Sequence, residues 1–270
     1  EKIRITGGEP LVRKNVMNLF ENLGKFLSIG KLKELTLTTN GSQLSKYAKD
    51  LYSYGVRRVN VSVDTLDEDL FSKLTRRGNL KQVLKGIEEA KKAGLKIKIN
   101  TVALKKTNEF ELVNILKWAH TNDYDMTIIE TMPLGEIEYD RTDQFLSLSK
   151  VRENISKHFE LRKSNHYTGG PSRYYEVVET GKRIGFITPL THNFCELCNR
   201  VRLTCTGKLY MCLGQEDSAD FTEAVRSENW KHDLVSSIKE AISRKPKGHD
   251  FIIKRKHAPA VNRHMSVTGG

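Results

Sequence analysis

The first half of the chain alternates between strand-like and helix-like periodicities, and this alternation limits the folds available to it. Apolar runs typical of strands occur at Lys2–Thr6, Glu34–Thr39, Arg58–Val63, Leu95–Val102 and Met126–Met132. Amphipathic helical patterns separate these runs, at Val16–Ile29, Ser42–Tyr54, Leu80–Ala93 and Glu109–Thr121. A strand–helix–strand repeat joins parallel strands, because the helix carries the chain back across the sheet. The alternation therefore predicts a parallel sheet covered by helices.

The repeat ends near Gly135, and the second half of the chain follows another plan. The same periodicities predict a helix, two short strands and a second helix, in the order Leu146–Phe159, Tyr174–Val178, Ile184–Thr188 and Leu234–Ser243. We therefore expect two domains, one over residues 1–140 that carries the repeat and one over residues 141–270.

Composition excludes several classes of protein. Of the 270 residues, 38% are hydrophobic and 29% are charged, which is typical of a globular protein and not of a collagen-like or disordered chain. No stretch approaches the roughly 18 uninterrupted apolar residues of a membrane span. The net charge of +12 favours an anionic partner, which could be a nucleic acid, a nucleotide or an acidic lipid.

Polar side chains gather near the carboxyl ends of the predicted strands. Within each strand they lie two residues apart and so share a face: Thr38 and Asn40, then Asn60, Ser62 and Asp64, then Lys98 and Asn100, then Glu130 and Met132. A single pair of this kind would be explained by a turn or a cap. Because the pattern recurs on four successive strands, we expect a site at the mouth of a curved parallel sheet.

All four cysteines of the chain fall within one short segment. Cys195 and Cys198 lie two residues apart and Cys212 follows on a later strand, a spacing typical of metal or cluster ligands and rare among core cysteines. Cys205 has no partner at such a spacing and is predicted to be a strand residue. The spacing alone does not decide between an iron–sulfur cluster and zinc, and a zinc site with all four cysteines, or with three and His192, stays open.

A glycine-rich loop, Thr6–Pro10, directly follows the first predicted strand. Gly7 and Gly8 let backbone groups approach a ligand without obstruction from side chains, and Glu9 adds an acceptor. Taken alone, this pattern is also typical of a turn. Its position in the strand–helix repeat, in a chain that also carries the cysteine segment, makes the pattern a specific sign of a ligand-binding loop.

These segments together resemble the radical S-adenosylmethionine enzymes and, within them, the GTP 3′,8-cyclases of molybdenum cofactor biosynthesis. The matching segments are Ile3–Arg13, Leu37–Gly41, Arg57–Asp64, Lys96–Val102, Phe194–Thr204, Gly207–Gly214 and Gly269–Gly270. The resemblance implies an α/β fold, an incomplete (β/α) parallel barrel with a C-terminal iron–sulfur cluster region. It implies a radical lyase that uses a 5′-deoxyadenosyl radical from S-adenosylmethionine to rearrange GTP to 3′,8-cyclo-7,8-dihydroguanosine 5′-triphosphate.

The resemblance also assigns roles to individual residues. The residues expected to contact S-adenosylmethionine are Gly8, Ser62 and Met132. The residues expected to face GTP are Arg4, Thr38, Lys98, Arg200, Val201 and Arg202. The expected ligands of a 4Fe–4S cluster with one iron open to the substrate are Cys195, Cys198 and Cys212. The Gly269-Gly270 tail is expected to reach toward the active site.

The sequence departs from the family pattern in two places. The C-x3-C-x2-C loop that holds the cluster for S-adenosylmethionine cleavage is not among these residues. We therefore expect a second 4Fe–4S cluster on a segment before Glu1, and no activity from these 270 residues alone. Thr127 stands where relatives tend to carry a basic residue, which could help to hold the substrate or cofactor.

The resemblance further implies GTP as substrate, flavodoxin or ferredoxin as electron donor, cyclic pyranopterin monophosphate synthase downstream, a homodimer, and a cytoplasmic location without membrane contact. Two other interpretations stay open. A zinc-containing nucleic-acid-binding module would use the positive charge, although the aromatic residues are not interleaved with basic ones as a stacking surface requires. A radical enzyme acting on a peptide would not need Arg200 and Arg202 beside the cysteines.

Overall fold

The computed structural model describes residues 1–135, 141–168, 170–191, 198–248, 251 and 259–268. The chain divides into two compact units. The first, here called the sheet unit, comprises Glu1–Thr131, Gln144–Tyr167 and Ser172–Ile187. The second, here called the cysteine unit, comprises Met132–Asp143, Thr168–Pro171 and Thr188–Gly270.

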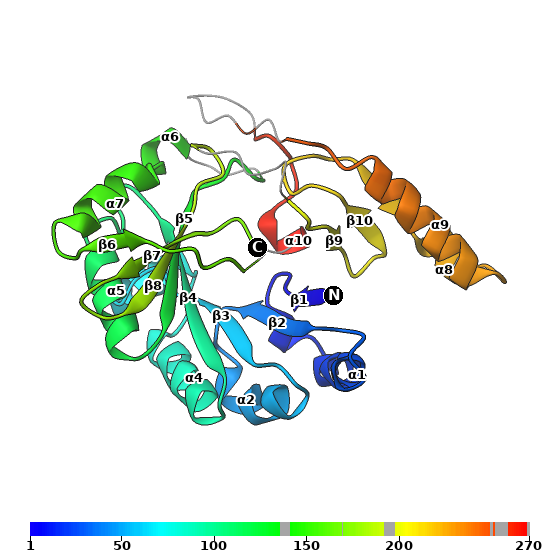
Figure 1. The fold of residues 1–270 in the computed structure, drawn as a ribbon, viewed down its shortest axis with the longest axis horizontal. Coiled ribbons are helices and arrows are strands. Elements are labelled where there is room, and N and C mark those ends of the chain that lie inside the picture. The colour runs from blue at the N-terminus through cyan, green and yellow to red at the C-terminus, as the bar shows by residue number, and fades with distance from the viewer. Residues whose placement is uncertain (136–140, 169, 192–197, 249–250, 252–258, 269–270) are drawn as a thin grey trace. The chain divides into compact units, whose positions relative to one another are not determined.

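The sheet unit is built on one curved, eight-stranded sheet with the strand order β1-β2-β3-β4-β5-β8-β7-β6 (Figure 1). Its strands are β1 (Lys2–Ile5), β2 (Glu34–Thr39), β3 (Arg58–Ser62), β4 (Lys96–Ala103), β5 (Asp125–Glu130), β6 (Leu161–Lys163), β7 (Arg173–Val177) and β8 (Lys182–Ile187). Strands β1 to β5 are parallel, as the strand–helix repeat predicts. Strand β8 joins them in the same direction, and β7 and β6 add two antiparallel strands at one edge. Among the described residues the sheet does not close, because β1 and β6 remain its edges.

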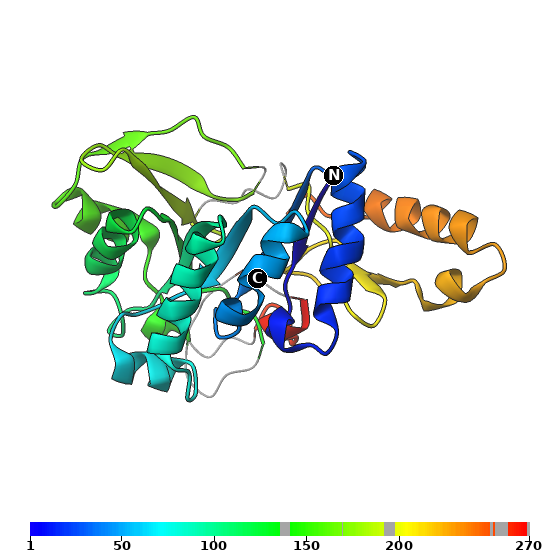
Figure 2. The same ribbon diagram turned by 90° about the horizontal axis from the view of Figure 1, so that it is seen from below.

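Helices form a layer on one face of this sheet (Figures 1 and 2). They are α1 (Val16–Ser28), α2 (Leu44–Ser53), α3 (Glu68–Leu74), α4 (Leu80–Lys92), α5 (Leu112–Thr121) and α7 (Leu148–Ser156). Short helical turns occur at η1 (Pro10–Val12) and α6 (Arg141–Gln144). The helix α4 shows how the sequence sets the bounds: Asn79 accepts the Gln82 N–H at its start, and Gly94 follows its end with φ of 93°.

The core of the sheet unit lies between the helices and the sheet. Alternate strand residues point into it, among them Leu37, Val59, Ile99 and Met126, all fully buried. Burial of one such side chain stabilises the fold by roughly 1.5–3 kcal/mol. Because alternate residues face opposite sides, this apolar layer fixes the orientation of every polar residue between them.

The cysteine unit has little regular structure and a small core. Strands β9 (Arg202–Leu203), β10 (Lys208–Tyr210) and β11 (Ser218–Asp220) form an antiparallel sheet in the order β11-β10-β9. The helices are α8 (Thr222–Arg226), α9 (Trp230–Ser243) and α10 (Met265–Thr268). Its buried apolar cluster comprises Leu209, Met211, Phe221 and Ala241.

Several sequence expectations differ from the structure in detail. The strand predicted to reach Met132 ends at Glu130. Cys205 is not a strand residue; it lies in the exposed turn between β9 and β10, where Gly207 has φ of 86°. The helix α3 is absent from the prediction. None of the helices in the described residues combines the length and the apolar composition that crossing a bilayer requires.

Candidate functional site

The face of the sheet opposite the helices carries a row of polar side chains. The strand registers pair Thr38 with Asn60 and Asn60 with Lys98. Residues paired in this way point to the same side of the sheet. Arg4 pairs with Thr36, and Thr36 pairs with Arg58. Because Thr36 and Arg58 lie two residues before Thr38 and Asn60, Arg4 lies on the same face of the sheet. The structure thus brings together Arg4, Thr38 and Lys98, the predicted substrate contacts of the sheet unit.

Lys98 is a buried cation that forms no ion pair with the described residues, although Asp125 is its neighbour in the ladder. Its side chain is 9% exposed, and its Nζ donates to the hydroxyl of Tyr174 at 2.6 Å. Among the described residues, no carboxylate oxygen lies within ion-pair distance of this ammonium group. Burial lowers the pKa of Lys98, and the hydrogen bond to Tyr174 only partly opposes that effect. A buried charge of this kind favours an anion as its partner.

Buried polar atoms without partners extend along the same face. Four of them have no hydrogen-bond partner among the described residues: Thr38 Oγ1, Asn60 Nδ2, Thr127 Oγ1 and Ser172 Oγ. Gly185 lies opposite Thr127 and has no room for a side chain, because a Cβ would come within 2.1 Å of Ser172 Oγ. Buried polar groups are normally satisfied, so this row fits a polar ligand or ordered water.

The glycine-rich loop is fastened by Glu9. One carboxylate oxygen accepts from the Leu11 N–H and the Thr39 hydroxyl, at 3.0 and 2.7 Å, and the other accepts from the Asn40 N–H at 2.6 Å. Glu9 therefore joins the loop after β1 to the end of β2. The backbone at Gly8 stays open, because a Cβ built there meets no atom within 4 Å.

The ends of β3 and β4 are linked by a second polar group. Ser62 is exposed at the end of β3, and Asp64 accepts from the Val102 N–H at 2.7 Å. Burial raises the pKa of Asp64 to about 6, against the lowering effect of that hydrogen bond. Asn108 completes the link by donating to the carbonyl oxygens of both Asp64 and Val102.

The prediction that Glu130 shares the polar face is wrong. The register pairs Lys98 with Asp125 and Ala103 with Glu130, so Glu130 points to the helix-covered side. It is 1% exposed and accepts from the Leu148 N–H at 3.3 Å, at the start of α7. Met132, which follows in the cysteine unit, is half-buried and its carbonyl oxygen accepts from the Leu134 N–H.

Two of the three predicted cluster ligands lie in the described part of the cysteine unit. Cys198 and Cys212 are free thiols of intermediate exposure. Burial opposes ionisation of Cys198, but hydrogen bonds and positive charge from Arg200 and the charge of Lys245 outweigh it and lower the pKa of the thiol. This environment favours the thiolate, which is the form that binds zinc or an iron–sulfur cluster.

The other predicted residues of this region lie in or just before β9, or outside the described residues. Arg202 begins β9, Arg200 and Arg202 are half-buried, and Val201 is exposed. The predicted residues outside the described part are Cys195, His192, Gly269 and Gly270. Within the described part, no three His, Cys, Asp or Glu side chains form a metal-binding group.

Sequence reasoning missed two residues of these sites. Tyr174, the acceptor for Lys98, lies on β7. The sequence predicts this strand but not its pairing with β8. Lys245 lies in a basic stretch after α9, and its Nζ donates to the carbonyl oxygens of Arg200 and Met211. Both contacts join residues more than 30 positions apart, so no local pattern indicates them.

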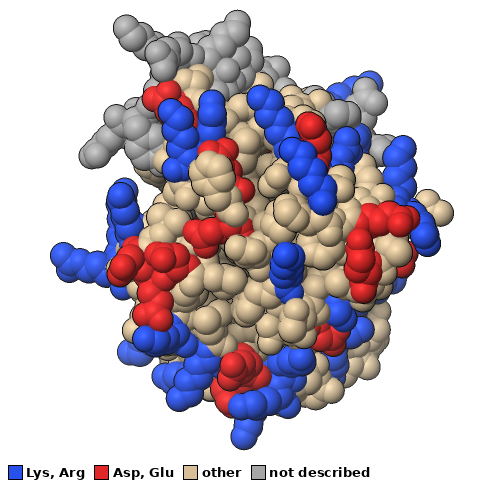
Figure 3. All heavy atoms as spheres, turned by 90° about the vertical axis from the view of Figure 1, so that its left-hand side faces the viewer, with Lys and Arg blue, Asp and Glu red and all other residues tan. Residues whose placement is uncertain are grey.

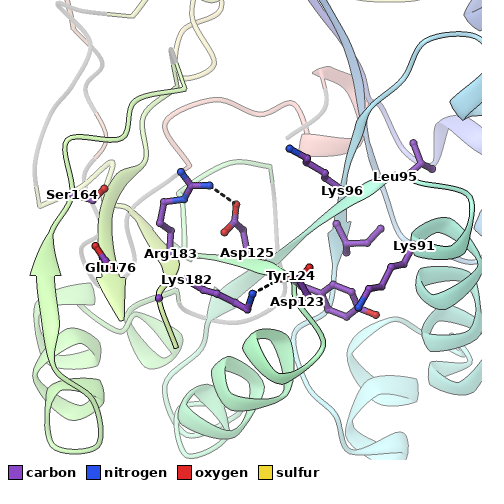
Figure 4. Close-up of a pocket in the computed structure, with 12 residues that line it drawn as sticks. Lys91, Leu95, Lys96, Asp123, Tyr124, Asp125, Ser164, Glu176, Lys182 and Arg183 are labelled. Atoms are coloured by element: carbon purple, nitrogen blue, oxygen red, sulfur yellow. Dashed lines mark hydrogen bonds and ion pairs between the residues drawn. The ribbon is translucent and has the colours of Figure 1, made fainter. Parts of the chain in front are cut away.

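A separate hollow of about 540 Å³ opens at the amino ends of β4, β5 and β8 (Figure 4). Its lining pairs Lys182 with Asp123, and Arg183 with Asp125 at 3.6 Å. It contains none of the predicted site residues. Ligands of parallel α/β sheets bind at the carboxyl ends of the strands, so this hollow lies at the opposite end from the expected site.

The net positive charge does not gather on the face that Figure 3 shows. There, Lys and Arg side chains are interspersed with Asp and Glu. Nucleic-acid-binding proteins typically present a continuous basic stripe or patch. This face gives no support to the nucleic-acid-binding interpretation.

Comparison with solved structures identifies the fold. The crystal structure of Streptococcus suis SuiB matches 98% of this chain and 66% of its own, with a TM-score of 0.59 and 16% identity. Residues 1–119 match the radical SAM superfamily, and residues 124–251 match the family described as Molybdenum Cofactor Synthesis C. The predicted fold class, an incomplete (β/α) barrel of the radical-SAM type, is confirmed.

Curated relatives are much closer in sequence. The GTP 3′,8-cyclase of Sinorhizobium medicae (strain WSM419) is 60% identical over 270 residues, which are all of this chain and 77% of that protein. The GTP 3′,8-cyclase of Brucella ovis is 59% identical over 270 residues, all of this chain and 78% of that protein. Identity at this level over the whole chain, together with both family matches, shows that the chain belongs to the GTP 3′,8-cyclase family of radical SAM enzymes.

Proposed function

We propose that this chain is a GTP 3′,8-cyclase of molybdenum cofactor biosynthesis that binds the triphosphate of GTP on the polar face of its sheet. The observation that carries the proposal is Lys98, a buried ammonium group in line with polar atoms of Thr38 and Asn60 that have no hydrogen-bond partner in the described part of the chain. Asp125, the neighbour of Lys98 in the ladder, pairs with Arg183, and Lys98 forms no ion pair among the described residues. A triphosphate would supply an anionic partner for Lys98. A peptide substrate would not require it.

The chain's own residues would bind and orient the reactants. For GTP we propose Arg4, Thr38 and Lys98 in the sheet unit, and Arg200, Val201 and Arg202 in the cysteine unit. Arginine and lysine suit this role because charge-assisted hydrogen bonds to phosphate are among the strong ones. Holding both reactants in one geometry lowers the barrier by removing orientational freedom before the reaction begins.

For S-adenosylmethionine we propose Gly8, Ser62 and Met132. The open backbone at Gly8 and the exposed hydroxyl of Ser62 lie at the carboxyl ends of β1 and β3. Glu9 would keep the loop in place, since its carboxylate is already satisfied by three donors of the protein. When bound, S-adenosylmethionine and the iron–sulfur clusters supply the radical chemistry, and the protein supplies binding, orientation and exclusion of water.

For the cluster we propose Cys195, Cys198 and Cys212 as ligands of a 4Fe–4S centre, with a second cluster held by residues outside this sequence. The lowered pKa of the Cys198 thiol supports a thiolate ligand there. We further propose flavodoxin or ferredoxin as electron donor, cyclic pyranopterin monophosphate synthase as the enzyme that takes the product, a homodimer and a cytoplasmic location. The domain division at residues 140 and 141 stays a prediction from the sequence; it differs from the compact units, because Gln144–Tyr167 and Ser172–Ile187 belong to the sheet unit.

Calorimetric titration of GTP into the purified chain tests the triphosphate site. Lys98→Met should weaken GTP binding by about ten- to a hundredfold, because a charge-assisted hydrogen bond is worth roughly 1.5–3 kcal/mol. Lys96→Met is the matched control, since Lys96 lies on the same strand and face but is exposed. Equal GTP affinity in the two variants, or no GTP binding by the unmodified chain, would contradict the proposal.

A further inference from the structure

Lys245, just beyond the end of α9, connects the two segments of the chain that carry Cys198 and Cys212. Its Nζ donates to the Arg200 carbonyl oxygen at 2.9 Å and to the Met211 carbonyl oxygen at 2.6 Å. The same nitrogen lies 4.0 Å from Cys198 Sγ. One ammonium group therefore reaches the residue two positions after Cys198, the residue before Cys212, and the Cys198 sulfur itself.

The position of this contact follows from the hairpin of β9 and β10. Its ladder pairs Leu209 with Leu203 and Tyr210 with Arg202. Cys198 precedes Arg202 and Cys212 follows Tyr210, so both thiols lie beyond the same end of the hairpin. The backbone pairing of these two strands stops at Tyr210 and Arg202, and the hydrogen bonds of Lys245 lie just beyond it.

Arg263 gives a useful contrast because it contacts the second segment alone. Its guanidinium group donates to the carbonyl oxygens of Cys212, Leu213 and Gln215 at 3.2, 2.8 and 2.7 Å, and it pairs with Glu216 at 2.6 Å. These bonds shape the loop after Cys212 but do not reach Cys198. Lys245 contacts both segments, which is the property that a spacer between two ligands requires.

We propose that Lys245 is a positioning residue of the cluster site, which sets the separation of Cys198 and Cys212 and adds one positive charge beside the ligating sulfur. The proposal rests on the proposed 4Fe–4S centre at these cysteines. Partners beyond the ligands themselves commonly orient metal ligands and tune the centre. Reduction adds one electron, so a nearby cation stabilises the reduced cluster more than the oxidised one.

The test compares single variants of the purified chain after anaerobic reconstitution with iron and sulfide. Two quantities are measured, the rate at which a chelator removes iron and the midpoint potential in a dithionite titration, in which dithionite supplies the electron. The variants are Lys245→Met, Lys245→Arg and the control Lys239→Met, which removes an exposed lysine of α9. Circular dichroism verifies that each variant is folded.

Lys245→Met should release iron several-fold faster than the unmodified chain and should have a more negative midpoint potential. Lys245→Arg should recover the potential because it keeps the charge, and Lys239→Met should change neither quantity. The inference is overturned if Lys245→Met matches Lys239→Met in both measurements, or if Lys245→Arg shifts the potential as much as Lys245→Met. It is also overturned if circular dichroism shows that both Lys245 variants are unfolded, since Lys245 would then serve the fold. Folded Lys245→Met that takes up no cluster would agree with the positioning role.

Failure of the proposed function would give a different result. If the unmodified chain takes up no iron and sulfide, or if Cys198→Ala takes up as much as the unmodified chain, the cluster assignment itself is wrong. If the unmodified chain carries the cluster and only the Lys245 comparison shows no effect, the cluster assignment stands and the role of Lys245 does not.

Discussion

In the sheet unit, the register of parallel strands aligns Thr38, Asn60 and Lys98, whereas in the cysteine unit hydrogen bonds from Lys245 and Arg263 hold the segments that carry the thiols. The sheet unit has a large apolar core behind its polar face, and the cysteine unit, as far as its residues are described, has a buried cluster of four. Position is therefore set by apolar packing in one unit and by polar contacts in the other. Polar substitutions should leave the geometry of the first largely intact and disturb the second.

The largest expected effect concerns the cysteine unit. Cys198→Ala should abolish the iron–sulfur absorption of the reconstituted chain, because a three-ligand site that loses one thiolate does not hold its cluster. Cys205→Ala should keep that absorption, since Cys205 lies in an exposed turn. Visible absorption of the anaerobic protein measures both. Equal loss in the two variants would mean that the ligands are assigned wrongly.

A smaller effect is expected from Asp64 in the sheet unit. Its pKa is raised from 3.8 to about 6, so the folded state binds a proton more tightly than the unfolded state. Between about pH 4 and pH 6, this group should make the free energy of unfolding fall as pH rises, by up to about 1.4 kcal/mol per pH unit. Asp64→Asn should remove this slope, as chemical denaturation at several pH values would show.

The exposed Asp69 of α3 provides the control for that measurement. Asp69→Asn should keep the pH dependence of the unmodified chain. If Asp64→Asn and Asp69→Asn give parallel stability curves, burial does not perturb Asp64 as described. GTP binding by Asp64→Asn would further show whether the polar face keeps its geometry when one of its polar contacts is altered.

The smallest effect is expected from the hydroxyl of Tyr174. Tyr174→Phe removes the acceptor at 2.6 Å from Lys98 and should weaken GTP binding by about three- to tenfold, the worth of a typical net hydrogen bond. Tyr175→Phe is the matched control, because the Tyr175 hydroxyl accepts from Arg152 at 2.6 Å and its neighbour in the ladder, Ile184, lies in the core. Calorimetry should show no change in that variant, and a similar loss in both would indicate a general effect on β7.

The predictable part of the fold is the part that local periodicity determines. Strand β2 matches its prediction from Glu34 to Thr39, and α4 differs from its own by one residue at its end. The helix α3 was missed although it carries a signal, since Asp67 accepts the Leu70 N–H and acidic residues fill its first turn. Strands of two or three residues, such as β9, are too short for alternation to be visible.

The candidate site was predictable to the extent that it depends on register. Spacing of two residues placed Asn60 and Lys98 on faces that the ladder then aligned. The same rule failed for Glu130. The prediction took Glu130 and Met132 as a pair on the polar face, but Met132 lies beyond the end of β5, and the register places Glu130 on the opposite face from Lys98. Tyr174 and Lys245 could not be predicted, since each acts across a long stretch of chain that only tertiary packing brings together.

The most direct test of this account is the metal content of the cysteine unit. Anaerobic reconstitution of the unmodified chain, followed by iron, sulfide and zinc analysis, should give about four iron and four sulfide per chain and no bound zinc. Such a result would agree with a 4Fe–4S centre that three cysteines hold and with membership of a radical enzyme family. One zinc per chain without sulfide would contradict the account and favour a zinc-binding module.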